Sequence, residues 1–250
     1  MKKLLMAANW KMYKTVAEGV RTATELAGLL GAVPEDREVL VCPPFTMLDA
    51  VCPILAKVGC RAGSQNFYPA KQGAFTGEIA PEQLLDLGCT HALAGHSERR
   101  HVLGEMDELI GRKVDFGLNA GLHMILCIGE TIVERRLGQI EEVLTRQLES
   151  GLAGVLATAT SENLSVAYEP VWAIGTGEVA GPDEILAAHA FVRAKLTVLL
   201  PQEGPRVRIL YGGSVKPDNA AAIIRLDNVD GVLVGGASLN ADSFSQIVLA

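Results

Sequence analysis

The stretch Ala167-Tyr168-Glu169-Pro170-Val171-Trp172-Ala173-Ile174-Gly175-Thr176-Gly177 joins the end of an apolar run to a constrained acid and a glycine-flanked loop. The run that leads into it begins at Leu164 and is typical of a short buried strand. Pro170 fixes its own φ and favours an extended backbone at Glu169, so the carboxylate has a rigid support. Bulky apolar residues and two glycines around Thr176 follow, which is a composition typical of closing loops. The stretch therefore predicts an acid at a strand end, beneath a lid.

Short apolar runs alternate with longer helical patterns along the whole chain. Parallel strands joined by right-handed helical crossovers produce this alternation. Eight such units in 250 residues predict an α/β fold, a single (β/α)8 TIM barrel of eight parallel strands that occupies residues 1–250 as one domain. The active site of such a barrel lies at the C-terminal ends of the strands. The eight runs are Leu4–Asn9, Glu38–Cys42, Arg61–Gln65, His91–Ala94, His123–Ile128, Ser165–Tyr168, Val207–Tyr211 and Gly231–Val234.

The composition indicates a large apolar core and an acidic surface. The chain is 49% hydrophobic and 20% charged, with a net charge of −7 and a pI of about 5.3. A nucleic-acid-binding protein would need a clustered basic face, so we expect no nucleic-acid partner. An acidic protein that binds an anionic substrate needs a locally positive site instead.

The cysteines and the apolar runs favour a cytoplasmic protein. No run approaches the roughly 20 apolar residues of a membrane span, so we expect no membrane association. An odd number of scattered cysteines without a CxxC pair argues against a disulfide framework or a zinc site and fits a reducing cytosol. The five are Cys42, Cys52, Cys60, Cys89 and Cys127.

Asn9 and Lys11 follow the first run. Residues two apart on a strand point the same way, so both side chains can reach the mouth of the barrel. Lys11 would supply positive charge there. Taken alone, a lysine at this position is more often a solvated strand-end residue.

His96 lies in the string Gly95-His96-Ser97-Glu98-Arg99-Arg100, after the fourth run. Ser97 is suited to cap a helix that begins just beyond His96. The positive end of a helix disfavours a protonated imidazole, so we expect His96 to be neutral near pH 7. The remaining histidines are interpreted as structural: His91, His101, His123 and His189.

Paired glycines end the last two runs, in Tyr211-Gly212-Gly213-Ser214-Val215 and Val234-Gly235-Gly236-Ala237-Ser238-Leu239. Glycine pairs let the backbone approach a ligand closely, and a short helix that follows presents free N–H groups to an anion. A phosphate site after strands 7 and 8 recurs in barrels of this kind. Together the two strings predict such a site.

The long segment after the third run ends in Gly73-Ala74-Phe75-Thr76-Gly77-Glu78-Ile79. Loops of this length usually have a function or belong to an interface. An apolar Phe75 beside Thr76 at the tip indicates insertion into a partner, and the alternative is a flexible surface loop.

Four further polar residues are interpreted as supports of the site. Glu98 and Glu105 should be buried or ion-paired, with Glu105 near Lys11. Cys127 should be a buried thiol, because no base is placed to activate it. Glu130 should begin a helix, where an acid suits the helix dipole.

The strings Asn9-Trp10-Lys11, Gly95–Arg100, 167–177 and Tyr211-Gly212-Gly213-Ser214 occur in the order in which they occur in triosephosphate isomerases. Over essentially its whole length the chain resembles that family. The resemblance implies a glycolytic and gluconeogenic isomerase that interconverts dihydroxyacetone phosphate and D-glyceraldehyde 3-phosphate through an enediol(ate), without a cofactor or a metal. It also implies a homodimer in which Thr76 reaches the partner's Asn9 and Lys11 region.

The same resemblance assigns roles to individual residues. Glu169 would be the base, His96 would polarise the carbonyl and move hydroxyl protons, and Lys11 would hold negative charge. Glu130 would steady the lid through Trp172. The residues expected to bind substrate are Asn9, Lys11, Gly175, Ser214, Gly235 and Gly236.

Two alternative functions remain open, and one residue departs from the family pattern. Another phosphate-binding barrel enzyme, such as a ribulose-phosphate epimerase, would need a pair of aspartates that no strand end shows. A non-catalytic sugar-phosphate-binding homologue on the same fold should have lost Glu169, His96 or Lys11, and all three are present. The departure is Glu178, where many family members carry Lys, and it concerns lid opening and closing.

Overall fold

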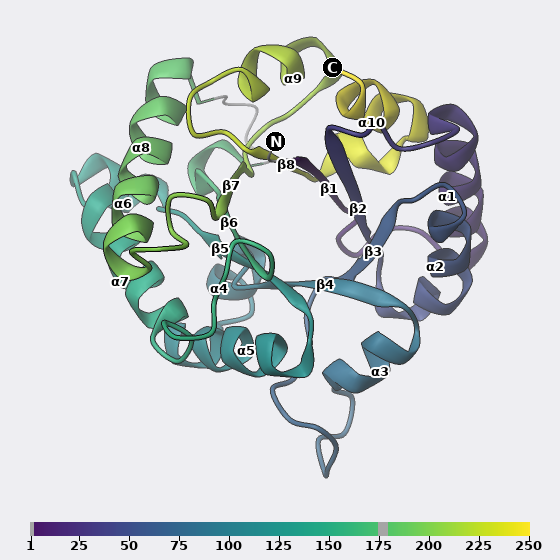
Figure 1. The fold of residues 1–250 in the computed structure, drawn as a ribbon, viewed down its shortest axis with the longest axis horizontal. Coiled ribbons are helices and arrows are strands. Elements are labelled where there is room, and N and C mark those ends of the chain that lie inside the picture. The colour runs from purple at the N-terminus through teal and green to yellow at the C-terminus, as the bar shows by residue number, and fades with distance from the viewer. Residues whose placement is uncertain (1–2, 175–179) are drawn as a thin grey trace.

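The computed structural model describes residues 3–174 and 180–250. Eight parallel strands close into a barrel in the order β1-β2-β3-β4-β5-β6-β7-β8, which confirms the predicted fold. Figure 1 looks down this barrel, with the strands around the centre and the helices in an outer ring. The strands are β1 (Leu4–Asn9), β2 (Arg37–Cys42), β3 (Arg61–Ser64), β4 (Cys89–Ala94), β5 (His123–Ile128), β6 (Leu164–Tyr168), β7 (Arg208–Tyr211) and β8 (Gly231–Val234).

Helices follow the strands, and α4, α6 and α10 begin at residues whose side chains cap the first turn. For α6, Thr131 Oγ1 accepts a hydrogen bond from the Glu134 N–H at 3.3 Å, and the Glu134 carboxylate accepts one from the Thr131 N–H at 2.7 Å. This reciprocal pair satisfies two N–H groups that the first turn would leave unpaired. The helices are α1 (Val16–Leu30), α2 (Leu48–Ala56), α3 (Pro81–Asp86), α4 (Ser97–His101), α5 (Asp107–Ala120), α6 (Ile132–Arg136), α7 (Ile140–Leu152), α8 (Pro182–Leu199), α9 (Pro217–Ile224) and α10 (Ala241–Val248), with 3₁₀ helices η1 (Phe45–Met47), η2 (Val171–Ala173) and η3 (Gly236–Leu239).

Alternation along the strands divides the core into two layers. In β1, Leu5 and Ala7 belong to the barrel interior, whereas Met6 and Ala8 pack in the layer between strands and helices. Asn9 continues the inward-facing set, because side chains two apart on a strand share a face. The interior layer is formed by Leu5, Ala7, Leu40, Cys42, Leu93, Ile125, Cys127, Ala167, Leu210 and Leu233.

The same alternation orients β6. Ala167 lies in the interior layer, and Val166 and Tyr168 lie in the outer one. Glu169 has the parity of Ala167, so its side chain is directed to the mouth of the barrel. The backbone alternation alone therefore aims both Asn9 and Glu169 at the C-terminal end.

Polar side chains line the opposite end of the barrel. We call Glu38, His91, His123, Ser165 and Arg208 the N-terminal polar cluster. The guanidinium of Arg208 donates to the Glu38 carboxylate at 2.6 Å, and the rings of His91 and His123 lie 4.5 Å apart. Nε2 of His123 lies 2.9 Å from the hydroxyl of Ser165. These contacts occur near the starts of the strands, away from the mouth.

The segment between β3 and α3 protrudes from the barrel, as Figure 1 shows below α3. Its base is ordered by a hydrogen bond of 2.9 Å from the Tyr68 N–H to the Ile79 oxygen and by the packing of Tyr68 on Phe75. Phe75 is nevertheless 42% exposed, and Thr76 beside it is exposed as well. Across residues 3–174 and 180–250, no helix is both long and apolar enough to cross a membrane.

Candidate active site

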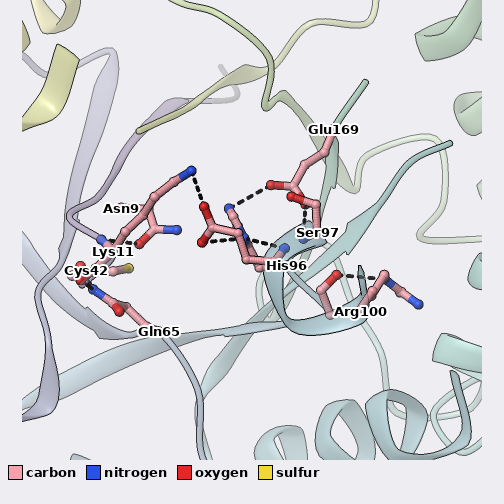
Figure 2. Close-up of polar contacts among 10 residues, drawn as sticks. Asn9, Lys11, Cys42, Gln65, His96, Ser97, Arg100 and Glu169 are labelled. Atoms are coloured by element: carbon pink, nitrogen blue, oxygen red, sulfur yellow. Dashed lines mark hydrogen bonds and ion pairs between the residues drawn. The ribbon is translucent and has the colours of Figure 1, made fainter. Parts of the chain in front are cut away.

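The ends of three strands bring Lys11, His96 and Glu169 to one cavity. Figure 2 shows their side chains converging, Lys11 after β1, His96 after β4 and Glu169 after β6. The cavity has a volume of about 780 Å³ and lies at the C-terminal end of the barrel. Its lining includes all the described residues that the sequence assigned to the site: Asn9, Lys11, His96, Glu169, Ser214, Gly235 and Gly236. Gly175, also assigned to it, lies outside the described residues, as does Glu178.

Glu169 is almost completely buried, with 2% of its surface exposed. One carboxylate oxygen accepts a hydrogen bond from the Ser97 N–H at 2.8 Å, and the other lies 2.9 Å from Nε2 of His96. These two contacts hold the carboxylate against the N-terminus of α4, next to the cavity.

Two glycines make room for Glu169. A Cβ atom added at Gly129 would lie 1.7 Å from the Glu169 backbone oxygen, and one added at Gly212 would lie 2.9 Å from Glu169 Cγ. The Glu169 N–H also donates to the oxygen of Ile128 at 2.7 Å. The end of β6 is therefore packed between its two neighbouring strands so closely that no side chain fits beside it.

His96 is the residue that precedes α4 and caps it. The turn before it, at Gly95, has φ of 75° and is held by Arg100, which donates to the oxygens of Gly95 at 2.7 Å and Cys127 at 2.9 Å. Nδ1 of His96 accepts a hydrogen bond of 3.4 Å from the Glu98 N–H. A neutral imidazole that carries its hydrogen on Nε2 and donates to Glu169 satisfies both contacts.

The carboxylates around His96 change the expectation for its charge. Burial lowers the pKa of His96, but the negative charge and hydrogen bond of Glu169, together with the charge of Glu98, raise it, and the net shift is upward. The sequence analysis considered only the N-terminus of α4. The structure shows that Glu169 and Glu98 also act on the protonation state of His96. Glu169 contributes the largest upward effects, so movement of Glu169 away from His96 would lower this pKa and favour the neutral form.

Lys11 lies in a strained turn that its neighbours stabilise. Its φ of 49° falls in the left-handed region, which a side-chain-bearing residue seldom adopts. The Asn9 side chain accepts from the Lys11 N–H at 2.9 Å. The Gln65 amide donates to the oxygens of Lys11 at 2.8 Å and Cys42 at 2.9 Å. Gln65 was not singled out from the sequence, because an amide at the end of an apolar run carries no signal of which backbone oxygens it will meet.

The two glutamates predicted as supports have different partners. Nζ of Lys11 lies 2.6 Å from the Glu98 carboxylate, an ion pair that compensates the lysine charge. Glu105 was expected to be buried or ion-paired as a support of the Lys11 neighbourhood, and the ion pairing is confirmed. Its carboxylate accepts from Arg99 at 2.6 Å and pairs with buried Lys113. Glu105 follows α4 in the chain, so its side chain reaches α5 rather than β1.

The glycine pairs of the last two strands border the cavity beside Lys11. A Cβ atom added at Gly235 would lie 3.2 Å from Cε of Lys11, whereas one at Gly236 would meet no atom within 4 Å. The Ser238 hydroxyl donates to the oxygen of Gly235 at 2.6 Å, and the Asn219 amide donates to the oxygen of Ser214 at 3.1 Å. The backbone around Gly236 is thus open toward the cavity and fixed behind it.

Cys127 and Glu130 lie beneath the site. Cys127 is fully buried, and burial, followed by the charge of Glu169, raises the pKa of its thiol, as a non-nucleophilic cysteine requires.

Glu130 does not begin a helix, since α6 starts at Ile132. Its fully buried carboxylate instead accepts from the Trp172 indole at 2.8 Å and from the Tyr168 hydroxyl at 3.2 Å. Trp172 leads into the predicted lid, so the contact predicted between Glu130 and Trp172 is confirmed.

A family model described as triosephosphate isomerase matches residues 4–250. The chain belongs to the triosephosphate isomerase family. Curated triosephosphate isomerases from Nitratidesulfovibrio vulgaris and Oleidesulfovibrio alaskensis are each 61% identical to it, over 99% of this chain and 100% of theirs. The crystal structure of triosephosphate isomerase from Bartonella henselae superposes with a TM-score of 0.88 at 38% identity, over 98% of this chain and 97% of that one.

The triosephosphate isomerase family therefore covers the whole barrel and every strand end that contributes to the cavity. Among the described residues, no group of three His, Cys, Asp or Glu side chains is arranged to hold a metal ion.

Proposed function

We propose that this protein interconverts dihydroxyacetone phosphate and D-glyceraldehyde 3-phosphate by proton transfer through an enediol(ate). The observation that carries the proposal is the convergence of Glu169, His96 and Lys11 on one cavity at the C-terminal end of the barrel. The chemistry needs a base beside a carbonyl-activated C–H, a donor to the carbonyl oxygen and an anchor for the phosphate. The family membership of the chain supports the same reaction.

Glu169 removes the proton and returns it to the neighbouring carbon. Its carboxylate is 2% exposed, so little water competes for it. To reach the substrate it has to exchange its contacts with Ser97 and His96 for the reacting carbon. His96, released from Glu169, then donates from Nε2 to the substrate oxygen on which negative charge develops, and it moves protons between the two oxygens.

Lys11 provides the positive charge that an acidic protein needs at an anion site. The Glu98 carboxylate forms an ion pair with Lys11 at 2.6 Å. An enediolate oxygen or the phosphate competes for the same ammonium, and charge-assisted hydrogen bonds to it favour the transition state. Asn9 keeps the turn at Lys11 in place through its side-chain oxygen.

The phosphate binds to the backbone at the ends of β7 and β8. Ser214, Gly235 and Gly236 line the cavity there, and the space over Gly236 is open. Backbone N–H groups at the start of a short helix are suited to a phosphate. Gly175 would add a further N–H from the lid. A non-catalytic homologue is disfavoured, because the three reacting side chains are all retained at one cavity.

The protein acts as a cytoplasmic homodimer in this proposal. Large apolar side chains are exposed on the protruding segment at Phe75, in the β1–α1 loop at Met12 and Tyr13, and after α4 at Val102 and Leu103. Exposed apolar groups of this kind mark interfaces. Thr76 would then enter the partner near the partner's Asn9 and Lys11. The five cysteines are all unpaired, which suits a reducing compartment.

An assay of triose phosphate isomerisation, coupled to a dehydrogenase that consumes one product, tests the proposed reaction. The intact protein should isomerise both substrates, and Glu169→Gln, which keeps the shape but cannot accept the proton, should lose nearly all turnover. A purified, folded protein without isomerase activity would overturn the proposal. A fully active Glu169→Gln variant would remove Glu169 from the base role and leave the reaction in place.

A further inference from the structure

Lys14 joins the loop that carries Lys11 to η3, the short helix after β8. Its ammonium donates to the backbone oxygen of Leu239 at 2.8 Å and to the hydroxyl of Thr22 at 2.9 Å. It also lies 5.5 Å from the centroid of the Trp10 ring. A partly buried lysine with these partners has a defined position, unlike a solvated surface lysine.

Trp10 binds the same helix from the same loop. The Trp10 side chain is 1% exposed, and its indole N–H donates to the oxygen of Ser238 at 3.1 Å. Trp10 and Lys14 thus donate hydrogen bonds to the last two carbonyl oxygens of η3, those of Ser238 and Leu239. The carbonyl end of a helix carries partial negative charge, so the ammonium of Lys14 also matches the polarity of η3.

The backbone of Lys14 indicates that its side chain is needed at this position. Its φ of 74° lies in the left-handed region, which favours glycine. A lysine in such a conformation persists only where its surroundings compensate. Here the compensating contacts are those to η3 and Thr22.

We propose that Lys14 is a positioning residue for the phosphate group of the substrate. It holds η3 from behind, so that the N–H groups at Gly235 and Gly236 keep their direction toward the cavity. As far as the described residues define it, the lining of the cavity does not include Lys14, so the residue acts through η3 and not by contact. The inference rests on the proposed phosphate position at Gly235 and Gly236.

Lys14→Met tests this role, because it keeps the aliphatic stem and removes the ammonium. The KM for triose phosphate and the inhibition constant of inorganic phosphate should rise together, by roughly tenfold. That factor is about what the lost hydrogen bond from the Lys14 ammonium to the Leu239 oxygen contributes to holding η3. The kcat should change by less than about threefold, since Glu169, His96 and Lys11 remain in place. Lys14→Arg, which restores a charged donor, should recover most of the phosphate affinity.

Lys195→Met is the matched control, because it removes a lysine that lies 5.7 Å from the Phe191 ring on α8, away from the cavity. Lys195→Met should change neither the KM for triose phosphate nor the inhibition constant of inorganic phosphate. Sedimentation should show the same assembly for all variants. If Lys14→Met does not fold, Lys14→Gly takes its place, since glycine adopts the positive φ freely.

A variant that binds inorganic phosphate normally but has a lower kcat would overturn the inference and place Lys14 in support of Lys11. Failure of inorganic phosphate to compete with substrate in the unaltered protein would be a different result. It would contradict the proposed phosphate position itself.

Discussion

The carboxylate of Glu169, at the end of β6, accepts a hydrogen bond of 2.8 Å from the N–H of Ser97, the first residue of α4. The neighbouring His96 contacts the other oxygen at 2.9 Å, so the segment after β4 supplies both polar partners of the base. Under the proposed mechanism, Glu169 is thus held by residues that it must release. A substrate has to replace those contacts before the proton can be removed.

Glu169→Asp should preserve the fold and lose about 10²-fold in kcat. The carboxylate would withdraw by one methylene, and a misplacement near 1 Å costs about that factor. Steady-state kinetics and thermal unfolding of the same preparation check this. Glu142→Asp makes the same change on the exposed face of α7 and should leave kcat unaltered. A Glu169→Asp variant with nearly normal turnover would contradict the role of Glu169 as base.

Glu169→Gln should lower the pKa of His96. Burial lowers this pKa, whereas Glu169 raises it by its charge and its hydrogen bond, with a smaller upward effect from Glu98. Without the Glu169 charge burial is the largest remaining effect, so a larger share of His96 is neutral at any given pH. An NMR titration of His96 in both proteins measures the change. Identical titration curves would show that Glu169 does not control the charge of His96.

Acid should destabilise the protein through buried neutral histidines. Burial is the main cause that lowers the pKa of His123 and of His189 to about 4. The unfolded chain, with histidines near 6.5, binds more protons between these values. The stability that each contributes is therefore complete above pH 6.5 and is lost as the pH falls toward 4. Between pH 7 and pH 5 the loss should be about 2 kcal/mol for each, partly offset by His96, whose raised pKa has the opposite sign.

Urea unfolding at pH 7 and pH 5 measures this loss. His123→Gln keeps a polar side chain between Glu162 and Ser165 but cannot be protonated, so its free energy of unfolding should depend less on pH. His101→Gln, at an exposed position, should retain the pH dependence of the parent protein. An unchanged dependence in His123→Gln would locate the acid sensitivity elsewhere.

Thr76→Arg should dissociate the proposed dimer. A long charged side chain at the tip of the protruding segment would have to enter a desolvated pocket of the partner, which costs several kcal/mol. Activity should fall with dissociation, although Thr76 does no chemistry. Sedimentation velocity of both proteins decides the matter, and an intact Thr76→Arg dimer would contradict the proposed interface.

Periodicity and strand-end position were sufficient to predict the barrel and to locate the cavity. Leu5 and Ala7 face the interior, so Asn9 had to face the mouth, and the same parity applies to Ala167 and Glu169. The sequence motifs did not single out Tyr13, Lys216, Asp218 or Ser243, which line the cavity, but they named Lys11, His96, Ser214, Gly235 and Gly236, which also line it. These features are local along the chain, which is why they could be predicted from the sequence alone.

Contacts between distant segments could not be predicted in this way. Gln65 meets the oxygen of Lys11, and Lys14 meets the oxygen of Leu239, across intervals that no spacing rule describes. The upward effect of Glu169 on the pKa of His96 could not be predicted for the same reason, because the helix that follows His96 is local and Glu169 is not. The ion-pair partners of Glu105, Arg99 and Lys113, could not be named from the sequence, because only the packing of α4 against α5 selects them.

Gly129 touches no substrate in the proposed mechanism, yet a single added carbon there would fall 1.7 Å from the backbone oxygen of Glu169. A mutational scan scored by growth would therefore rank Gly129 beside the base itself. The space beside Gly129 has to stay empty, and neither chemical rescue nor an added cofactor could compensate for filling it. In a comparison of many sequences, an invariant glycine at this position would indicate the close packing at the end of β6. An invariant glutamate at position 169 would indicate the proposed chemistry.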